Sequence, residues 1–112
     1  MLDGLAQLPQ SGSRNLVHRV VQAYLDRSGE LMTRLGEEID SMNVDGVRAG
    51  AHALKSSSAN VGALHFSGLC KVLEAAAKQE DLSQVEATWQ QIQDEYSNVI
   101  EALKCRVKVA AA

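Results

Sequence analysis

Residues 51–63 of the chain read AHALKSSSANVGA, and the spacing of their large apolar side chains indicates the fold class. At about 100° per residue, Leu54 and Val61 lie on one side of a helix, and Val47 of the preceding turn joins them. His52 lies roughly opposite these three residues. The pattern therefore predicts a helix with a buried apolar stripe and an exposed face that carries His52.

The segments on either side have the same periodicity. From about residue 14 to residue 42 the pattern favours one long helix over two, although Gly29 interrupts it and could mark a bend or a short break. Asn43 and Asp45 mark the next boundary. A shorter helix is predicted over residues 64–79, and its apolar stripe consists of Leu69, Val72, Leu73 and Ala76. From Val85 to Leu103, apolar residues alternate in steps of four and three, as in the seam of a helical bundle.

Short connections between these helices predict that neighbours run antiparallel. We expect an all-α fold: an up-and-down four-helix bundle over about residues 13–105, with an additional short N-terminal helix over residues 3–8. The 112 residues form one domain, and the tail over residues 106–112 is expected to fray. The composition agrees, because 46% of the residues are hydrophobic but only 4% are aromatic and one is proline.

The composition gives no indication of several kinds of partner or location. The net charge of −3 gives no indication of nucleic-acid binding. No apolar run approaches the roughly 18 residues that span a bilayer, so we expect no membrane insertion of this chain. The N-terminus has neither a basic start nor an apolar run, so we expect no signal peptide and a cytoplasmic location. Cys70 lies in an apolar stripe, where a buried, reduced thiol is expected.

Small and basic residues surround His52 on the predicted exposed face. Those within about 40° of it on the helical wheel are Arg48, Ser56, Ala59 and Ala63, and Lys55 and Gly62 lie slightly farther round. A neutral imidazole nitrogen is a competent nucleophile near neutral pH. Cations one turn away would stabilise a phosphoryl group on it, and small side chains let a partner approach closely.

This segment resembles a known family signature. Residues 52–63, HALKSSSANVGA, are similar to the pattern H-x-L-K-G/S-S/A-S/A-x-x-L/V/I-G-A of histidine-containing phosphotransfer (HPt) domains from bacterial two-component phosphorelays. Residues 69–74, LCKVLE, followed by Ala77 and Lys78, resemble the next helix of that family. The predicted bundle is similar to the family fold over nearly the whole chain.

The resemblance implies a role for each matching residue. His52 is the phosphoacceptor through Nε2, Lys55 stabilises the phosphoryl group, and Gly62 gives the partner access. Ser56, where glycine is frequent in the family, can hydrogen-bond the phosphoryl group, and Glu74 can hydrogen-bond the other ring nitrogen of His52. The expected partner-binding residues are Arg48, Ala59, Ala63, Lys71 and Lys78.

The family relationship also implies the partners. The chain is expected to be a monomeric phosphohistidine carrier that accepts a phosphoryl group from a receiver-domain aspartate of a hybrid sensor kinase and passes it to another receiver domain. It lacks a nucleotide-binding loop, so no autonomous kinase activity is expected. We expect no cofactor on this chain and Mg²⁺ on the receiver domain.

Other interpretations remain open. The chain could be a non-catalytic helical adaptor that binds or sequesters a receiver or kinase domain without being phosphorylated, or a structural bundle that dimerises through its last helix. His18 is interpreted as a structural residue. A metal site at His52 and His65 is not expected, because no carboxylate or thiol joins them at ligand spacing.

Overall fold

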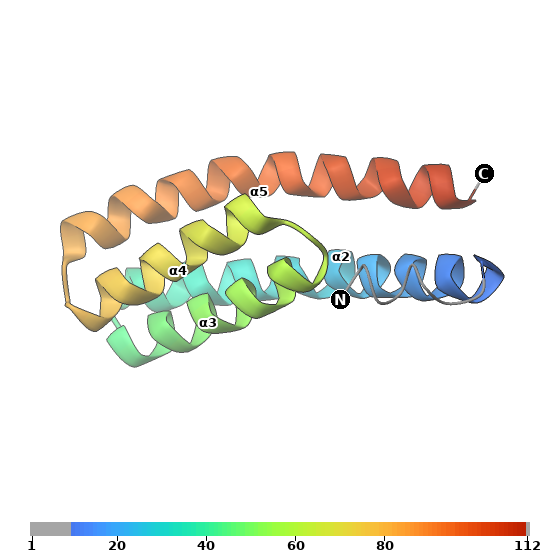
Figure 1. Cartoon of the computed structure of the whole chain (residues 1–112). Coiled ribbons are helices and arrows are strands. Elements are labelled where there is room, and N and C mark those ends of the chain that lie inside the picture. The colour runs from blue at the N-terminus through green and yellow to red at the C-terminus, as the bar shows by residue number, and fades with distance from the viewer. Residues whose placement is uncertain (1–9, 112) are drawn as a thin grey trace.

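The computed structural model describes the backbone of residues 10–111 and the side chains of residues 16–105. Within these residues the chain forms four helices and no strand: α2 (Gln10–Asp40), α3 (Val44–Asn60), α4 (Leu64–Lys78) and α5 (Leu82–Ala111). Consecutive helices run antiparallel, and three residues join each pair (Figure 1). The predicted all-α bundle is confirmed for this part of the chain, and the helix expected over residues 3–8 lies outside it.

The three links between helices share one turn geometry. Each contains a residue with positive φ, namely Met42 at 57°, Gly62 at 81° and Glu80 at 56°. The following backbone N–H then donates to a carbonyl in the last turn of the helix, as Ala63 does to Ser58 at 2.9 Å. This is the Schellman pattern of helix termination, and it reverses the chain within three residues.

Side chains cap the starts of two helices. The Oδ1 of Asn43 accepts a hydrogen bond from the backbone N–H of Gly46 at 3.3 Å, at the start of α3. Asp81 accepts one from the N–H of Gln84 at 3.1 Å, at the start of α5. These caps satisfy backbone N–H groups that have no partner inside the helix. The boundary predicted at Asn43 is therefore confirmed.

The helical segment is longer at both ends than the expected 13–105. α2 begins at Gln10, and α5 continues to Ala111. Residues 106–111 continue α5 as helical backbone, and they contain neither glycine nor proline and end in alanine, the strongest helix former. That this tail frays stays a prediction.

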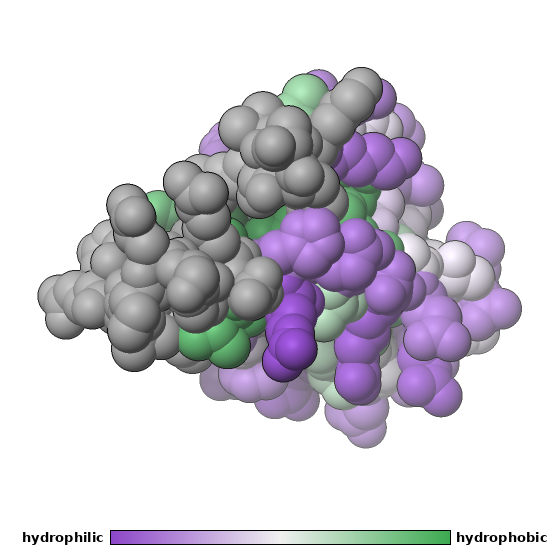
Figure 2. Space-filling model, turned by 90° about the vertical axis from the view of Figure 1, so that its right-hand side faces the viewer, coloured by the Kyte–Doolittle hydropathy of each residue, from purple (hydrophilic) through white to green (hydrophobic). Residues whose placement is uncertain are grey.

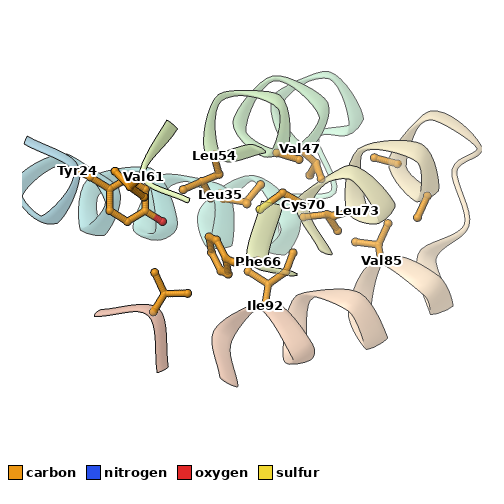
Figure 3. Packing of buried hydrophobic residues seen from close by; sticks show 14 of the residues in the cluster. Tyr24, Leu35, Val47, Leu54, Val61, Phe66, Cys70, Leu73, Val85 and Ile92 are labelled. Atoms are coloured by element: carbon orange, nitrogen blue, oxygen red, sulfur yellow. The ribbon is translucent and has the colours of Figure 1, made fainter. Parts of the chain in front are cut away.

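The core lies between the four helices (Figure 3). Of the seam predicted for the last helix, Val85, Ile92, Val99 and Leu103 are buried. Its other two residues, Trp89 and Tyr96, are partly buried and pack against this core. The stripe predicted for α4 was partly wrong, because the Val72 side chain is 43% exposed. Four buried residues of α4 follow steps of four, three and four, namely Phe66, Cys70, Leu73 and Ala77, and Ala76 is buried beside them.

Two pairs of hydroxyl groups tie α2 to its neighbours. The Tyr24 hydroxyl lies 2.8 Å from Ser58 Oγ on α3, and Ser28 Oγ lies 2.7 Å from the Tyr96 hydroxyl on α5. Burial raises the pKa of Tyr24 to about 12, so its hydroxyl keeps its proton. The pairs satisfy polar groups that would be costly to bury alone.

α2 and α5 run on beyond the α3–α4 turn, at the right of Figure 1. Figure 2 shows this end of the bundle, where coloured hydrophobic residues lie between the helices and hydrophilic side chains lie along the outer side. In residues 10–111, no helix has an apolar stretch of the length needed to cross a membrane. The amphipathic helices bury their apolar faces against one another.

Candidate functional site

His52 is the central residue of α3, eight residues from either end of the helix. The face opposite it enters the core, where Val47, Ala51 and Leu54 are at most 3% exposed. The His52 side chain is 61% exposed. The imidazole therefore projects from the bundle, in the direction that the helical wheel predicts.

One carboxylate on α4 reaches both His52 and Lys55. Glu74 Oε2 lies 3.3 Å from His52 Nδ1, and Glu74 Oε1 accepts a hydrogen bond from Lys55 Nζ at 2.9 Å. The side chains of Glu74 and Lys55 are 28% and 29% exposed, so this contact is partly shielded from water. The structure thus brings together three residues that the sequence assigns to the site.

The electrostatics follow from this arrangement. The pKa of Glu74 is lowered from its usual value of 4.5, first by the hydrogen bond from Lys55 and then by the charges of Lys55 and His52. Partial burial opposes this lowering without overcoming it. Glu74 is therefore a carboxylate at neutral pH and an acceptor for both neighbours.

Ser67 connects α4 to α3 beside this contact. Its Oγ donates a hydrogen bond to the backbone carbonyl of Lys55 at 2.8 Å. Ser67 precedes Glu74 by seven residues, which is two helical turns, so both side chains lie on the same face of α4. Sequence reasoning missed Ser67. The seven-residue spacing from Glu74 is the signal that could have revealed it.

The other predicted residues on this side are exposed. Ser56 and Ala59 follow His52 on the outer face of α3. Arg48 is 45% exposed, and its Nη1 lies 3.9 Å from Asp45 Oδ1. Lys71 and Lys78 lie one turn before and one turn after Glu74 on α4, and both are exposed. They add positive charge to the surface around His52.

Gly62 and Ala63 do not share the helical face of His52. The helical wheel was wrong for them because α3 ends at Asn60. Asn60, the last residue of α3, lies eight residues after His52, about 12 Å along the helix axis at 1.5 Å per residue, and Gly62 follows in the turn. Its φ of 81° is favourable for glycine and strained for other residues. The positive φ in the α3–α4 turn thus explains why a glycine stands at position 62. The role of Gly62 in partner access stays a prediction.

An open groove between α2 and α3 begins beside His52. It has a volume of about 410 Å³, and Ala53 and Ser56, the neighbours of His52 on α3, line one wall. The facing wall is formed by residues of α2: Val20, Ala23, Tyr24, Arg27, Ser28 and Leu31. The groove offers a mainly apolar surface that includes one cation, Arg27.

The other two histidines lie elsewhere. His18 is half-buried on α2, and His65 is exposed at the start of α4. Among the residues whose side chains are described, no three or more His, Cys, Asp or Glu residues form a cluster suited to a metal ion. Cys70 is fully buried, and burial raises the pKa of its thiol to about 12.

Comparison with known proteins identifies the family. The family model of the Hpt domain matches residues 19–103, which include α3, α4 and most of α2 and α5. No curated protein and no solved structure matches the chain. The matched region contains His52, Lys55 and Glu74, and the all-helical architecture agrees with an Hpt bundle. The chain therefore belongs to the Hpt domain family.

Proposed function

We propose that the chain is a phosphorelay intermediate in which His52 carries the phosphoryl group. Hpt domains transfer phosphoryl groups through a histidine and interact with receiver domains. Here His52 accepts the group from an aspartyl phosphate on the receiver domain of a hybrid sensor kinase and passes it to the aspartate of another receiver domain. The observation that carries the proposal is an exposed imidazole whose Nδ1 faces a carboxylate, because this leaves Nε2 free towards solvent.

The chemistry follows from that orientation. A carboxylate next to Nδ1 favours the tautomer that is protonated on Nδ1, and the lone pair then lies on Nε2. Nε2 attacks phosphorus, the N–P bond forms, and the bond from phosphorus to the aspartate oxygen breaks with its electron pair left on the aspartate carboxylate. The proton stays on Nδ1 beside Glu74 throughout. Transfer to the second receiver is the same reaction in reverse.

The partner supplies what this chain does not. A receiver domain brings Mg²⁺ and the acidic residues that hold it, and this chain binds no cofactor of its own. Arg48, Lys71 and Lys78 then face an acidic surface, which favours encounter. We further propose that the chain acts as a cytoplasmic monomer and has no kinase activity of its own.

The surface around His52 supports transient docking. Ala59 and Ser56 leave space beside the imidazole, and the groove between α2 and α3 provides an apolar contact next to it. Gly62 and Ala63 would lie at the edge of the partner's footprint, because they belong to the turn after α3. Such a small, partly polar contact suits a partner that must bind, react and leave.

The test is transfer from a phosphorylated receiver domain. Wild-type protein is expected to acquire label that is labile in acid and stable in alkali, as phosphohistidine is, and His52→Gln is expected to acquire none. His65→Gln removes another exposed histidine and is expected to label like wild type. Label that persists in His52→Gln contradicts the assignment of the site. Binding of receiver domains without label on the wild type supports the adaptor interpretation instead.

A further inference from the structure

Glu74 divides its two oxygens between the phosphoacceptor and the residue that stabilises the phosphoryl group. Oε2 is 3.3 Å from His52 Nδ1, whereas Oε1 is 2.9 Å from Lys55 Nζ. In the unphosphorylated protein, the ammonium group of Lys55 is therefore already paired. A phosphoryl group on His52 has to draw this cation away from Glu74 or share it.

The contact between Lys55 and Glu74 is strong enough to compete with a phosphoryl group for the ammonium group of Lys55. An ammonium–carboxylate hydrogen bond of 2.9 Å is charge-assisted, and both side chains are about 70% shielded from water. Partial burial makes the attraction larger than that of a fully exposed ion pair. Ser67 adds to it, because its bond to the Lys55 carbonyl fixes α4 at the level of this pair.

Lys55 can also reach the phosphoryl group. It follows His52 by three residues on α3, and residues at that spacing are neighbours on the helix surface. Its four-carbon side chain can reorient without any movement of the backbone. Glu74, by contrast, remains next to Nδ1, which does not react.

We propose that Glu74 and the phosphoryl group compete for Lys55, so that Glu74 limits the lifetime of the phosphohistidine. The inference rests on the proposed function in that His52 is taken as the phosphorylated residue. Glu74 is thus a positioning residue that acts through Lys55 and keeps the phosphoryl group ready to leave. A protein that relays a group benefits from such an arrangement more than one that stores it.

The direction of the effect follows from the charges. In hydrolysis, a water oxygen attacks phosphorus, the N–P bond breaks, its electron pair returns to Nε2, and a water proton goes to solvent. Lys55 can form a charge-assisted contact with the dianionic phosphoryl group of the phosphohistidine, and this contact stabilises the group before water attacks. Whatever releases Lys55 from Glu74 therefore lengthens the lifetime.

Several other charged side chains lie near the site. Arg48 on α3 and Lys71 and Lys78 on α4 are exposed cations on the same side of the bundle, and Arg27 of α2 lines the groove that begins beside His52. None of these side chains has a recorded ion pair or hydrogen bond with Glu74 among the described residues. A change at Glu74 therefore acts first on Lys55 and His52.

The experiment is a double-mutant cycle on the phosphohistidine lifetime. Wild type, Glu74→Gln, Lys55→Ala and the double variant are phosphorylated chemically with phosphoramidate, a small donor that requires no partner protein. The decay of the phosphohistidine signal is then followed by ³¹P NMR. His52→Gln identifies any signal from His18 or His65. Glu101→Gln, which removes an exposed carboxylate on α5, controls for the change in net charge.

Glu74→Gln is expected to lengthen the lifetime by about threefold or more when Lys55 is present, and by clearly less in the Lys55→Ala background. Lys55→Ala alone is expected to shorten the lifetime, and Glu101→Gln is expected to leave it unchanged. An equal effect of Glu74→Gln in both backgrounds, or a shorter lifetime in Glu74→Gln, overturns the inference. If the Glu74 and Lys55 substitutions are coupled in the phosphoramidate experiment but no phosphorylated receiver domain labels the protein, the proposed function is contradicted and the inference about Glu74 stands.

Discussion

At the scale of single residues, Glu74 connects the groups of the site to one another. Ser67, two turns before it, bonds α4 to the Lys55 carbonyl of α3, Lys55 lowers the pKa of Glu74, and the second oxygen of Glu74 faces His52. Without that carboxylate, the imidazole would have no described neighbour that selects one ring nitrogen over the other. The surroundings of an exposed histidine are thus organised from the adjacent helix.

The same residue predicts a pH dependence of stability. Because its pKa is lower in the folded protein than in the unfolded chain, Glu74 contributes stability above about pH 4.5 that is lost as the pH falls through the folded-state pKa. We expect the unfolding free energy of wild type to exceed that of Glu74→Gln by about 0.5 kcal/mol at pH 6, the size of a partly screened ion pair. At about pH 3 the two unfolding free energies are expected to be nearly equal. Urea denaturation at the two pH values measures this difference.

Lys55→Ala is the matched control for that measurement. Replacing Glu74 by Gln in the Lys55→Ala background is expected to change the unfolding free energy little at either pH, since Lys55 is the main cause of the lowered pKa. If the difference in unfolding free energy between wild type and Glu74→Gln increases towards low pH, this explanation is contradicted.

At the scale of helices, the links between them carry backbone strain at two positions. Met42 and Glu80 adopt φ values of 57° and 56°, in the left-handed region that costs residues other than glycine about 1 kcal/mol or more. The Schellman geometry requires this conformation, and Gly62 meets the same requirement without strain. The chain therefore terminates α2 and α4 at some cost in stability and α3 at little.

Relief of that strain is measurable. Glu80→Gly is expected to raise the unfolding free energy by about 0.5–1 kcal/mol, or the melting temperature by a few degrees. Gln79→Gly, one residue earlier at a φ of −87°, is the control and is expected to lower stability, because glycine there gains only freedom in the unfolded chain. Thermal unfolding of both variants distinguishes the two cases. Equal destabilisation by both contradicts a strained turn at Glu80.

The helix scale also shows how far sequence reasoning reaches. Val47, Leu54 and Val61 were placed in the core by their spacing alone, and all three are buried. Gly62 was misplaced because periodicity does not state where a helix stops. Ser28 and Ser58 were not expected in the core, since their partners Tyr96 and Tyr24 come from other helices. The contact of Glu74 with Lys55 likewise depends on how two helices pack, which a single helix pattern does not contain.

At the scale of the whole molecule, charge is distributed unevenly. Residues 44–78, which form α3 and α4, contain four Lys or Arg and two Asp or Glu residues, a net charge of +2. The chain as a whole has a net charge of −3, so the remaining residues carry −5. His52 therefore stands on the positive part of an acidic protein. An acidic partner surface is attracted to that side and repelled by the rest of the molecule.

This asymmetry predicts a salt-dependent encounter. The association rate with a phosphorylated receiver domain is expected to fall by about threefold to tenfold as the salt concentration rises from about 50 mM to about 0.5 M. Stopped-flow measurement of Lys78→Ala should give a lower rate and a weaker salt dependence. Lys104→Ala, which removes an exposed cation on α5, should behave like wild type. A salt-independent rate contradicts electrostatic steering.

The three-residue links between the helices have a further consequence, for the speed of folding. Each helix meets the next one after a very short connection, so pairing neighbours closes loops that cost little conformational entropy. Among the described helices, the main pairing that joins distant parts of the chain is that of α2 with α5. Helical bundles with such local pairing fold within microseconds to milliseconds. A molecule that opens transiently therefore regains the surface around His52 within about a millisecond.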